Sequence, residues 1–428
     1  MKLVIVESPA KAKTIEKYLG RDYIVDASGG HVRDLPEKAI GIDVKNNFKP
    51  EYVIYPKKQD VVRRLAGLSK KAEKVYLATD PDREGEAISW HLMNALGLDD
   101  NYSRIMFNEI SKRAVNEAIE KPGKINMDLV NAQQARRILD RLVGYELSPV
   151  LCKKIQGKLS AGRVQSAALK LIVDRDREIK SFVKEEYWSV TAFLKKLTGS
   201  DIVFKAVLES KCGKKIKLEN KEKTDAVLKE LEGKDYTVES VKKSVNYGNP
   251  PPPFTTSTLQ QESSTKLGMA SNVTMQIAQQ LYEGLDLTGL GHIALVTYIR
   301  TDSTRVSAEA TAKARETLAE KYGEKYVPQK PNIYKSRKNS QDAHEAIRPI
   351  NLELTPESIK DKLQRNQYRL YKLIYERFLA SQAAKAVYDS VNVTIKNGDY
   401  AFKSTGKTMT FDGYTRIYAA APKEEAGE

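Results

Sequence analysis

The sequence predicts a multidomain protein that combines an α/β domain with α+β modules. Its 428 residues are too many for one ordinary hydrophobic core, so we expect about two to four domains. Near the start of the chain, apolar strand patterns are followed directly by helix patterns, which is typical of a parallel sheet. From Lys184 onward the hydrophobic period changes to two, which predicts a β-rich module.

The first strand and helix are marked by their residue types. Residues 3–8, LVIVES, form an almost continuous apolar run of the kind found in buried parallel strands. Ser8 is a suitable N-cap and Pro9 suits the first helical turn. We therefore expect a helix that runs to Leu19, with Gly20 behind it.

A second strand and helix are expected around the sequence VYLATDPDREGE. Residues 75–79 are rich in β-branched and apolar types and predict a short buried strand. The helix pattern that follows places Ile88, Leu92 and Leu96 on an apolar face and stops at Gly97.

Carboxylates are expected where these two strands end. Glu7 closes the first strand, and Asp80, Asp82 and Glu84 follow the second. If the strands are neighbours, all four meet at the sheet edge where open α/β sheets bind ligands, and an extended backbone would aim the last three in one direction. Their hard oxygen atoms suit Mg²⁺, which keeps several waters and can contact a phosphate. The alternative is a solvated acidic turn with Arg83 as its counter-ion.

Lys11 and the loop SGGHVRDLP (28–36) are weaker signals. Lys11 lies in the first helical turn, where anions are preferred, so it is either solvated or compensated by a bound phosphate. In the loop, His31 and Arg33 could approach a phosphate backbone. A surface turn with a solvated histidine is the alternative.

The net charge of +15 indicates a polyanionic partner. Seven Lys and Arg residues stand against two acids between Arg136 and Arg163. A helix expected over 128–143 carries one basic face, made of Arg136, Arg137, Asp140 and Arg141. The LSAGRVQS loop (159–166) follows, and the combination favours binding of a phosphate backbone over a merely solvated face. An anionic membrane surface is the rival partner, but no basic helix with a Trp/Phe/Leu face supports it.

The remaining elements follow from periodicity and turn residues. Strands are expected over 188–194, 202–208 and 236–245, and helices over 112–120, 164–179, 223–232, 256–283, 308–322 and 368–386. Two strands near 390–395 and 414–418 and an unstructured tail over 419–428 complete the chain. The prolines at 250–253 predict a stiff connector of the kind found at a boundary or hinge.

A tyrosine and an arginine stand close together in LVTYIRTDSTR (295–305). On an extended segment, Tyr298 and Arg300 would lie on one face about 7 Å apart. Tyrosine is a weak nucleophile at neutral pH because its pKa is ~10, but a guanidinium could stabilise the phenolate and a developing phosphorane-like charge. The alternative is a buried tyrosine with a paired arginine. In QDAHEAIRP (341–349), His344 and Arg348 are one helical turn apart in sequence.

Composition excludes several classes of protein. No apolar run approaches the ~20 residues that cross a bilayer, and the start of the chain lacks the pattern of a secretory signal, so we expect a cytoplasmic protein. The two cysteines, Cys152 and Cys212, support neither a disulfide framework nor a structural zinc site. The sequence contains no GxxxxGK[ST] phosphate loop.

Taken together, the motifs resemble those of the type IA DNA topoisomerases, close to the bacterial topoisomerase I branch. They are, in the family's order, VESPAKAKTIEKYLG, SGGHVRDLP, ATDPDREGE, LSAGRVQS, LVTYIRTDS and DAHEAIRP. The resemblance covers the chain from Leu3 to about Tyr418, and its specificity comes from the combination.

The resemblance implies a toroidal arch in which further domains enclose a hole that opens when a single strand is cut. It divides the chain into a Toprim domain with a parallel α/β sheet (1–112), a helical DNA-binding domain (113–180), the first part of a β-rich arch domain (181–256), a helical domain that carries the nucleophile (257–384), and a β-rich return segment with the tail (385–428).

Carried over residue by residue, the resemblance implies roles for the residues above. Tyr298 is the nucleophile that forms a 5′-phosphotyrosyl link, and Arg300 stabilises charge on the scissile phosphate. Glu7 protonates the leaving oxygen, Lys11 lies at the same phosphate, and His344 lies close to the nucleophile. The implied Mg²⁺ ligands are Glu7, Asp80, Asp82 and Glu84. The implied DNA contacts are His31, Arg136, Arg137, Asp140, Tyr145, Cys152, Ser160, Ala161, Gly162, Arg163, Val164, Gln165 and Arg300.

The implied activity is ATP-independent relaxation of negatively supercoiled DNA by transient single-strand cleavage, strand passage and religation, with Mg²⁺ as cofactor and no zinc. The implied partner is single-stranded or underwound DNA, with no membrane, and the implied state is a nucleoid-associated monomer. Family members continue with further helices and often zinc-ribbon modules, so we expect this chain to be a fragment, and a natural short form is the alternative. The alternatives are a truncated, non-catalytic single-stranded DNA-binding fragment and another Toprim nucleic-acid enzyme. Decatenation is the alternative main task within the family.

Overall fold

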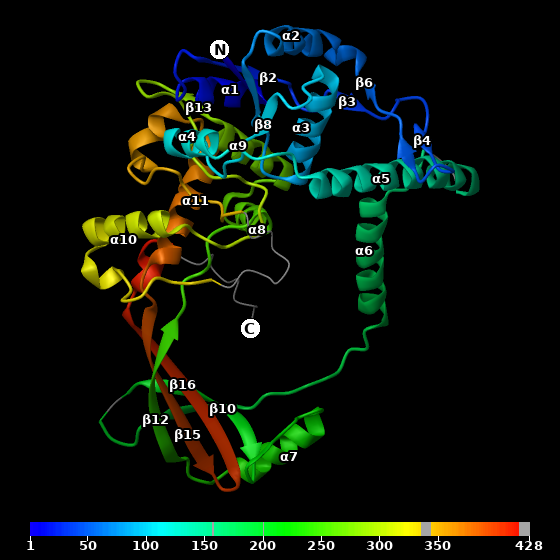
Figure 1. The fold of residues 1–428 in the computed structure, drawn as a ribbon. Coiled ribbons are helices and arrows are strands. Elements are labelled where there is room, and N and C mark those ends of the chain that lie inside the picture. Colours follow the sequence, from blue (N-terminus) through cyan, green and yellow to red (C-terminus); the bar gives the residue numbers. More distant parts are fainter. Residues whose placement is uncertain (156–157, 200, 335–343, 419–428) are drawn as a thin grey trace.

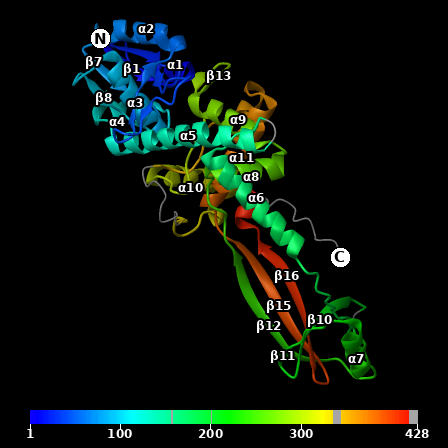
Figure 2. The same ribbon diagram turned by 90° about the vertical axis from the view of Figure 1, so that its right-hand side faces the viewer.

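The computed structural model describes residues 1–155, 158–199, 201–334 and 344–418, and Figures 1 and 2 show it from two directions. The tail expected over 419–428 and the first three residues of the QDAHEAIRP motif lie outside these ranges. Within them, no helix has the length and apolar character needed to cross a membrane.

The N-terminal part is built on a four-stranded parallel sheet. Its strand order is β2–β1–β7–β8, with bounds β1 (Lys2–Val6), β2 (Tyr23–Ala27), β7 (Lys74–Leu77) and β8 (Tyr102–Arg104). The two strands expected from sequence are therefore neighbours, and Leu3 lies in register with Val75. Each leads into a helix, α1 (Pro9–Glu16) with Ser8 as its N-cap and α3 (Arg83–Leu96), which ends at a left-handed Gly97. Short antiparallel pairs lie beside the sheet: β3 (Arg33–Asp34) with β6 (Val53–Ile54), and β4 (Ile42–Asp43) with β5 (Lys49–Pro50).

Successive residues of β1 pack on opposite faces of this sheet. Leu3 and Ile5 belong to a hydrophobic core formed with α2 (Gln59–Ser69) and α3. Val4 and Val6 belong to a second core that continues into the segment 254–418. Both faces of the sheet are thus buried, as the continuous apolar strand pattern predicts. The second core joins the N-terminal part to the region that carries Tyr298.

Three helices lead away from the sheet: α4 (Lys112–Glu120), α5 (Met127–Lys154) and α6 (Arg163–Ser181). The sequence predicts that the middle helix ends at Val143, which is wrong. It continues through Gly144 and Pro149, because an interior glycine costs only ~1 kcal/mol relative to alanine and does not by itself stop a helix. From α6 the chain runs to a distant antiparallel sheet and returns to the helical region, so the ribbon traces a ring (Figure 1).

The distant sheet combines strands from two parts of the chain, residues 191–248 and residues 386–411. Its order is β11–β10–β16–β15–β12, with β9 beside β10. The bounds are β9 (Thr191–Lys195), β10 (Val203–Lys211), β11 (Lys214–Lys215), β12 (Thr237–Gly248), β15 (Ala386–Asn397) and β16 (Tyr400–Phe411), and helix α7 (Lys221–Leu231) packs on the sheet. Figure 2 shows its long strands extending away from the helices. The strand expected over 414–418 is wrong, because Ile417 and Tyr418 follow a short 3₁₀ turn into the helical core instead.

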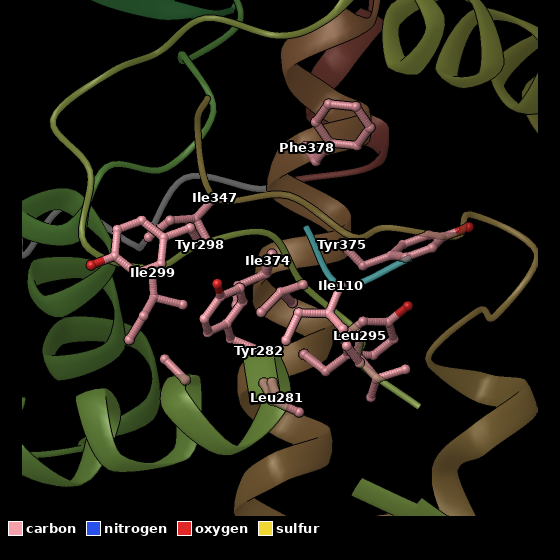
Figure 3. Packing of buried hydrophobic residues seen from close by; sticks show 14 of the residues in the cluster. Ile110, Leu281, Tyr282, Leu295, Tyr298, Ile299, Ile347, Ile374, Tyr375 and Phe378 are labelled. Carbon is pink, nitrogen blue, oxygen red and sulfur yellow. The ribbon is translucent and has the colours of Figure 1, made fainter. Parts of the chain in front are cut away.

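The helical region surrounds the candidate nucleophile. It contains α8 (Thr256–Leu267), α9 (Ser271–Glu283), α10 (Ala308–Tyr322), α11 (Arg365–Gln382) and the hairpin of β13 (Leu285–Leu287) with β14 (Gly291–Ile293). The helix expected over 256–283 is divided at Gly268, which has a positive φ. Figure 3 shows Tyr282 and Tyr298 among the side chains of this core, next to α11.

Two local expectations in this region are wrong. The segment 295–305 is not a regular strand, since only Val296 forms an isolated bridge, to Pro349. His344 and Arg348 are not on a helical turn, and the segment between them is extended enough for Ile347 to bridge Phe254. Tertiary contacts with neighbouring segments, rather than local periodicity, set both conformations.

Gly85 offers a test of how α3 packs against the end of β7. A Cβ at Gly85 would lie 2.1 Å from the backbone oxygen of Asp80, so Gly85→Ala must displace that backbone and should cost ~1–3 kcal/mol. The matched control is Gly67→Ala in α2, where a Cβ meets nothing within 4 Å and should be neutral or stabilise by ~0.4–1 kcal/mol. Urea unfolding followed by circular dichroism compares the two. Equal stability of both variants would contradict this packing.

Candidate active site

The ends of β1 and β7 bring Glu7, Asp80 and Lys11 together. The Asp80 amide donates to Glu7 Oε1 at 2.7 Å. Lys11 Nζ lies 2.6 Å from Asp80 Oδ1 and 3.8 Å from Glu7 Oε2, and only 1% of the lysine is exposed. Burial lowers the pKa of Lys11, but Asp80 and Glu7 outweigh this effect and raise it, so the ammonium stays charged. Lys11 is therefore not solvated, and the compensating negative charge comes from within the protein.

The backbone that carries the acidic residues is held by Arg104, which is fully buried. Its Nη1 donates to the carbonyls of Leu77, Thr79 and Ile105, and its Nη2 donates to the carbonyl of Asp80 at 2.8 Å. Its Nε donates to Glu86 Oε2 at 2.9 Å. Leu77 is the last residue of β7, and its carbonyl also accepts from the Ile105 amide, whereas Thr79 and Asp80 lie beyond the strand. The guanidinium thus supplies hydrogen bonds to backbone groups past the end of β7.

Tyr298 and Arg300 meet at Asp82. The Tyr298 hydroxyl donates to Asp82 Oδ2 at 2.5 Å, and Arg300 Nη1 lies 3.9 Å from the same oxygen. Asp82 is also the N-cap of α3, since its Oδ1 accepts from the Gly85 amide. The carboxylate is therefore oriented by two hydrogen bonds, one to each of its oxygens. The tyrosine is buried and the arginine is paired, as in the structural alternative, but both converge on Asp82, a carboxylate predicted as a metal ligand.

The proton on Tyr298 is held firmly in this arrangement. Burial first, and then the charges of Asp80 and Asp82, raise the pKa of the Tyr298 hydroxyl far above its ordinary value, while Arg300 acts in the opposite direction. His344 borders the phenol, with 5.5 Å between the ring centroids, and its Nε2 lies 2.6 Å from the Pro81 carbonyl.

The expected alignment of Asp80, Asp82 and Glu84 on an extended backbone is wrong, because α3 begins at Arg83. Glu84 lies in the first helical turn, where Gln133 Nε2 donates to its Oε2 at 3.1 Å and His31 Nε2 lies 3.5 Å from the same oxygen. The hydrogen bond from His31 is the largest influence that lowers the pKa of Glu84 to about 2.

A pocket of about 850 Å³ opens in front of these side chains. Its carboxylates are Glu7, Asp82, Glu84 and Asp302, and its cationic or imidazole groups are His31, Arg83, Arg136, Arg300 and His344. Asp80 does not line this pocket; its carboxylate is buried in the ion pair with Lys11. The four predicted metal ligands therefore do not converge, and within the described ranges no three His, Cys, Asp or Glu side chains are arranged to hold a metal ion. Three of the four still offer hard oxygen donors to the same space, which fits an ion that keeps several waters.

Glu7 has an unusual protonation behaviour for a carboxylic acid. Burial first, and then the nearby charges of Asp80 and Asp82, raise the pKa of Glu7 to about 7, although Lys11 and the Asp80 amide act in the opposite direction. Near neutral pH a substantial fraction of Glu7 is therefore protonated and able to donate a proton into the pocket.

A second pocket, of about 840 Å³, lies between α5 and α6. Most of the predicted DNA-binding residues line it, namely Arg137, Asp140, Tyr145, Ser160, Ala161, Gly162, Arg163, Val164 and Gln165. A smaller pocket, of about 260 Å³, shares Arg137 with this second pocket. It shares His31 and Glu84 with the first pocket, in front of Asp82 and Arg300. Cys152 does not line any of the three, and its Sγ donates to the Leu159 carbonyl at 3.0 Å.

The basic face of α5 is less positive than its sequence indicates, because its arginines have partners in the protein. Arg136 lies 3.9 Å from Asp140 of the same face, and Asp140 also makes a bidentate pair with Arg163 of α6, at 2.8 and 3.1 Å. Arg137 pairs with Asp34, with 2.9 Å between Nε and Oδ1. Arg141 donates to the Tyr145 hydroxyl at 2.6 Å and to the backbone of the loop before β4. These partners reduce the net positive charge of the face and hold the guanidinium groups in fixed orientations.

Two residues of the site were missed by sequence reasoning. Arg104 gives no signal, because a single arginine after a short strand has no pattern of its own. Tyr282 lies in the helix expected over 256–283 and was given no role, but its hydroxyl donates to Asp80 Oδ1 at 2.9 Å and its ring packs against that of Tyr298.

Comparison with known proteins agrees with this geometry. Residues 2–110 match the Toprim domain family and residues 124–428 match the family described as DNA topoisomerase. The solved structure of full-length topoisomerase I from Thermotoga maritima is similar to the whole chain at 44% identity, with a TM-score of 0.83, and the match covers 68% of that protein. The chain therefore belongs to the type IA DNA topoisomerase family.

Proposed function

We propose that this topoisomerase relaxes negatively supercoiled DNA without ATP, by cleaving one strand through a 5′-phosphotyrosyl intermediate, passing a strand through the break and religating it. The observation that carries the proposal is the 2.5 Å hydrogen bond from the Tyr298 hydroxyl to Asp82. It aims the phenol proton at a carboxylate, and the same carboxylate lies beside Arg300.

The proposed cleavage step balances with the groups in this pocket. The Tyr298 oxygen forms a bond to phosphorus while the bond from phosphorus to the 3′ oxygen breaks. The phenol proton moves along its hydrogen bond to Asp82, and Arg300 stabilises the charge on the non-bridging oxygens. Religation reverses these movements. Because one phosphodiester is exchanged for one phosphotyrosine, the cycle needs no ATP.

Glu7 is the proposed general acid for the leaving 3′ oxygen. Its pKa of about 7 matches the operating pH, which is the condition under which a general acid transfers a proton best. Its position beside Asp82 in the pocket allows one carboxyl group to take a proton while the other gives one.

Mg²⁺ is the proposed cofactor. Asp82, Glu84 and the ionised form of Glu7 line one pocket and would offer it oxygen donors, with water completing its coordination. When bound, it would supply positive charge next to the scissile phosphate. Asp80 would then act mainly as the partner of Lys11, which keeps a fixed ammonium behind the carboxylates.

Single-stranded or underwound DNA is the proposed substrate. The pocket at Asp82 and Arg300 and the pocket between α5 and α6 are linked through residues that line a third, smaller pocket, and arginines line both. A single strand lying across them would meet backbone-binding arginines at one end and the nucleophile at the other, with affinity dominated by phosphate contacts.

Replacement of the nucleophile tests the proposal directly. Tyr298→Phe should bind a labelled single-stranded oligonucleotide as wild type does but form no covalent adduct, because phenylalanine has no oxygen to attack phosphorus. Denaturing gel electrophoresis detects the adduct. Tyr187→Phe, at a residue that is 86% exposed, is the control and should keep the wild-type adduct. An adduct of wild-type yield in Tyr298→Phe would refute the assignment.

The pocket between α5 and α6 is tested by salt dependence. Arg163→Ala should weaken oligonucleotide binding and lower the slope of log affinity against log salt by about 0.7, because one phosphate contact is lost. It also leaves Asp140 without its bidentate partner, which adds repulsion. Lys229→Ala, on α7 of the distant sheet, is the control. Fluorescence anisotropy measures the salt slopes of both variants. Identical slopes for Arg163→Ala and Lys229→Ala would show that DNA does not bind in this pocket.

A further inference from the structure

Tyr282, near the end of α9, contacts three residues of the site at once. Its hydroxyl donates to Asp80 Oδ1 at 2.9 Å. Its ring packs edge-on against Tyr298, with 5.3 Å between the centroids, and Lys11 Nζ lies 5.1 Å from the centre of the same ring. Tyr282 and Tyr298 are labelled side by side in Figure 3.

The hydroxyl of Tyr282 acts only as a donor in this position. The residue is fully buried, and burial together with the charge of Asp80 raises its pKa well above the ordinary value. Asp80 Oδ1 therefore receives hydrogen bonds from Tyr282 and Lys11 together. The two donors hold this carboxylate in the interior, so that Asp82 alone of the Asp-Pro-Asp sequence faces the nucleophile.

The ring of Tyr282 has a separate effect on Tyr298. Tyr298 is bordered by Tyr282 on one side and His344 on another, and its hydroxyl is fixed by Asp82. With two ring contacts and one hydrogen bond, the phenol has little freedom to rotate. A misplacement of ~1 Å can cost about 100-fold in rate, so this support matters for attack on phosphorus.

We propose that Tyr282 is a positioning residue for DNA cleavage, which acts through Asp80 by its hydroxyl and through Tyr298 by its ring. This inference rests on the proposed function, because it assigns Tyr282 a part in the same step. It predicts that the two parts of the side chain can be separated by mutation.

The test measures the single-turnover rate of covalent adduct formation and, separately, the Kd for the same oligonucleotide. Tyr282→Phe keeps the ring and removes the donor to Asp80, so the cleavage rate should fall roughly 10-fold with an unchanged Kd. Tyr282→Leu removes both effects and should lower the rate roughly 100-fold. Tyr371→Phe is the matched control. This residue is also fully buried in the same core, but its hydroxyl donates to the Leu354 carbonyl, away from the site, so its rate should equal that of wild type.

A double-mutant cycle separates positioning from general stability. If the hydroxyl acts through Asp80, the variant with both Tyr282→Phe and Asp80→Asn should cleave no more slowly than Asp80→Asn alone, because neighbouring effects that share one route are not additive. Fully additive losses would overturn this route. A Tyr282→Phe rate equal to that of Tyr371→Phe would overturn the inference while leaving the proposed function intact. A wild-type chain that binds the oligonucleotide without forming an adduct would overturn the proposed function and the inference with it.

Discussion

The site depends on how the chain is held as it leaves β7, and Arg104 does this with one buried guanidinium. Its hydrogen bonds to the carbonyls of Leu77, Thr79 and Asp80 hold the last residue of β7 and the segment that follows it. Its charge is balanced by Glu86, which also accepts from the amide of Asn126 just before α5. A planar donor with five N–H groups suits such a divergent set of acceptors, whereas a lysine does not. The same residue therefore connects the strand end, α3 and the start of α5.

Asp80 and Asp82 are two residues apart but lie in different environments. The first is enclosed by Lys11 and Tyr282, and the second caps α3 and accepts a hydrogen bond from the Tyr298 hydroxyl. Burying a carboxylate is costly unless it is paired and hydrogen-bonded, and Asp80 meets both conditions. The outcome is a negative charge inside the protein that raises the pKa values of both Glu7 and Tyr298.

Tyr298 is part of a hydrophobic core and not of an exposed loop. Tyr298 lies in the cluster that contains Val4 and Val6 of the N-terminal sheet. Its amide donates to the Asn108 carbonyl at 2.8 Å, and nearby Arg348 pairs with Glu109 at the same distance. Packing, a backbone hydrogen bond and an ion pair thus join the segment that carries Tyr298 to the N-terminal part that carries the carboxylates. Any movement that separates them must break these contacts.

Local patterns in the sequence were enough to predict the parallel strands 3–8 and 75–79, the helices that follow them, and the convergence of Glu7 with Asp80, because strand period, N-caps and glycine stops are short-range properties. The motifs also predicted Tyr298, Arg300 and His344 as site residues, and the structure brings them together around Asp82. The sequence did not indicate that Lys11 would be buried, that Glu84 would turn away into a helix toward His31, or that Arg104 and Tyr282 would hold the acidic segment. Those outcomes depend on contacts between residues far apart in the chain, such as the one between Asp80 and Tyr282. The sequence by itself determined which chemical groups are available. Only the tertiary structure decided that Asp80 is neutralised in the interior and that Asp82 faces Tyr298, because burial and the nearest opposite charge are properties of the folded chain.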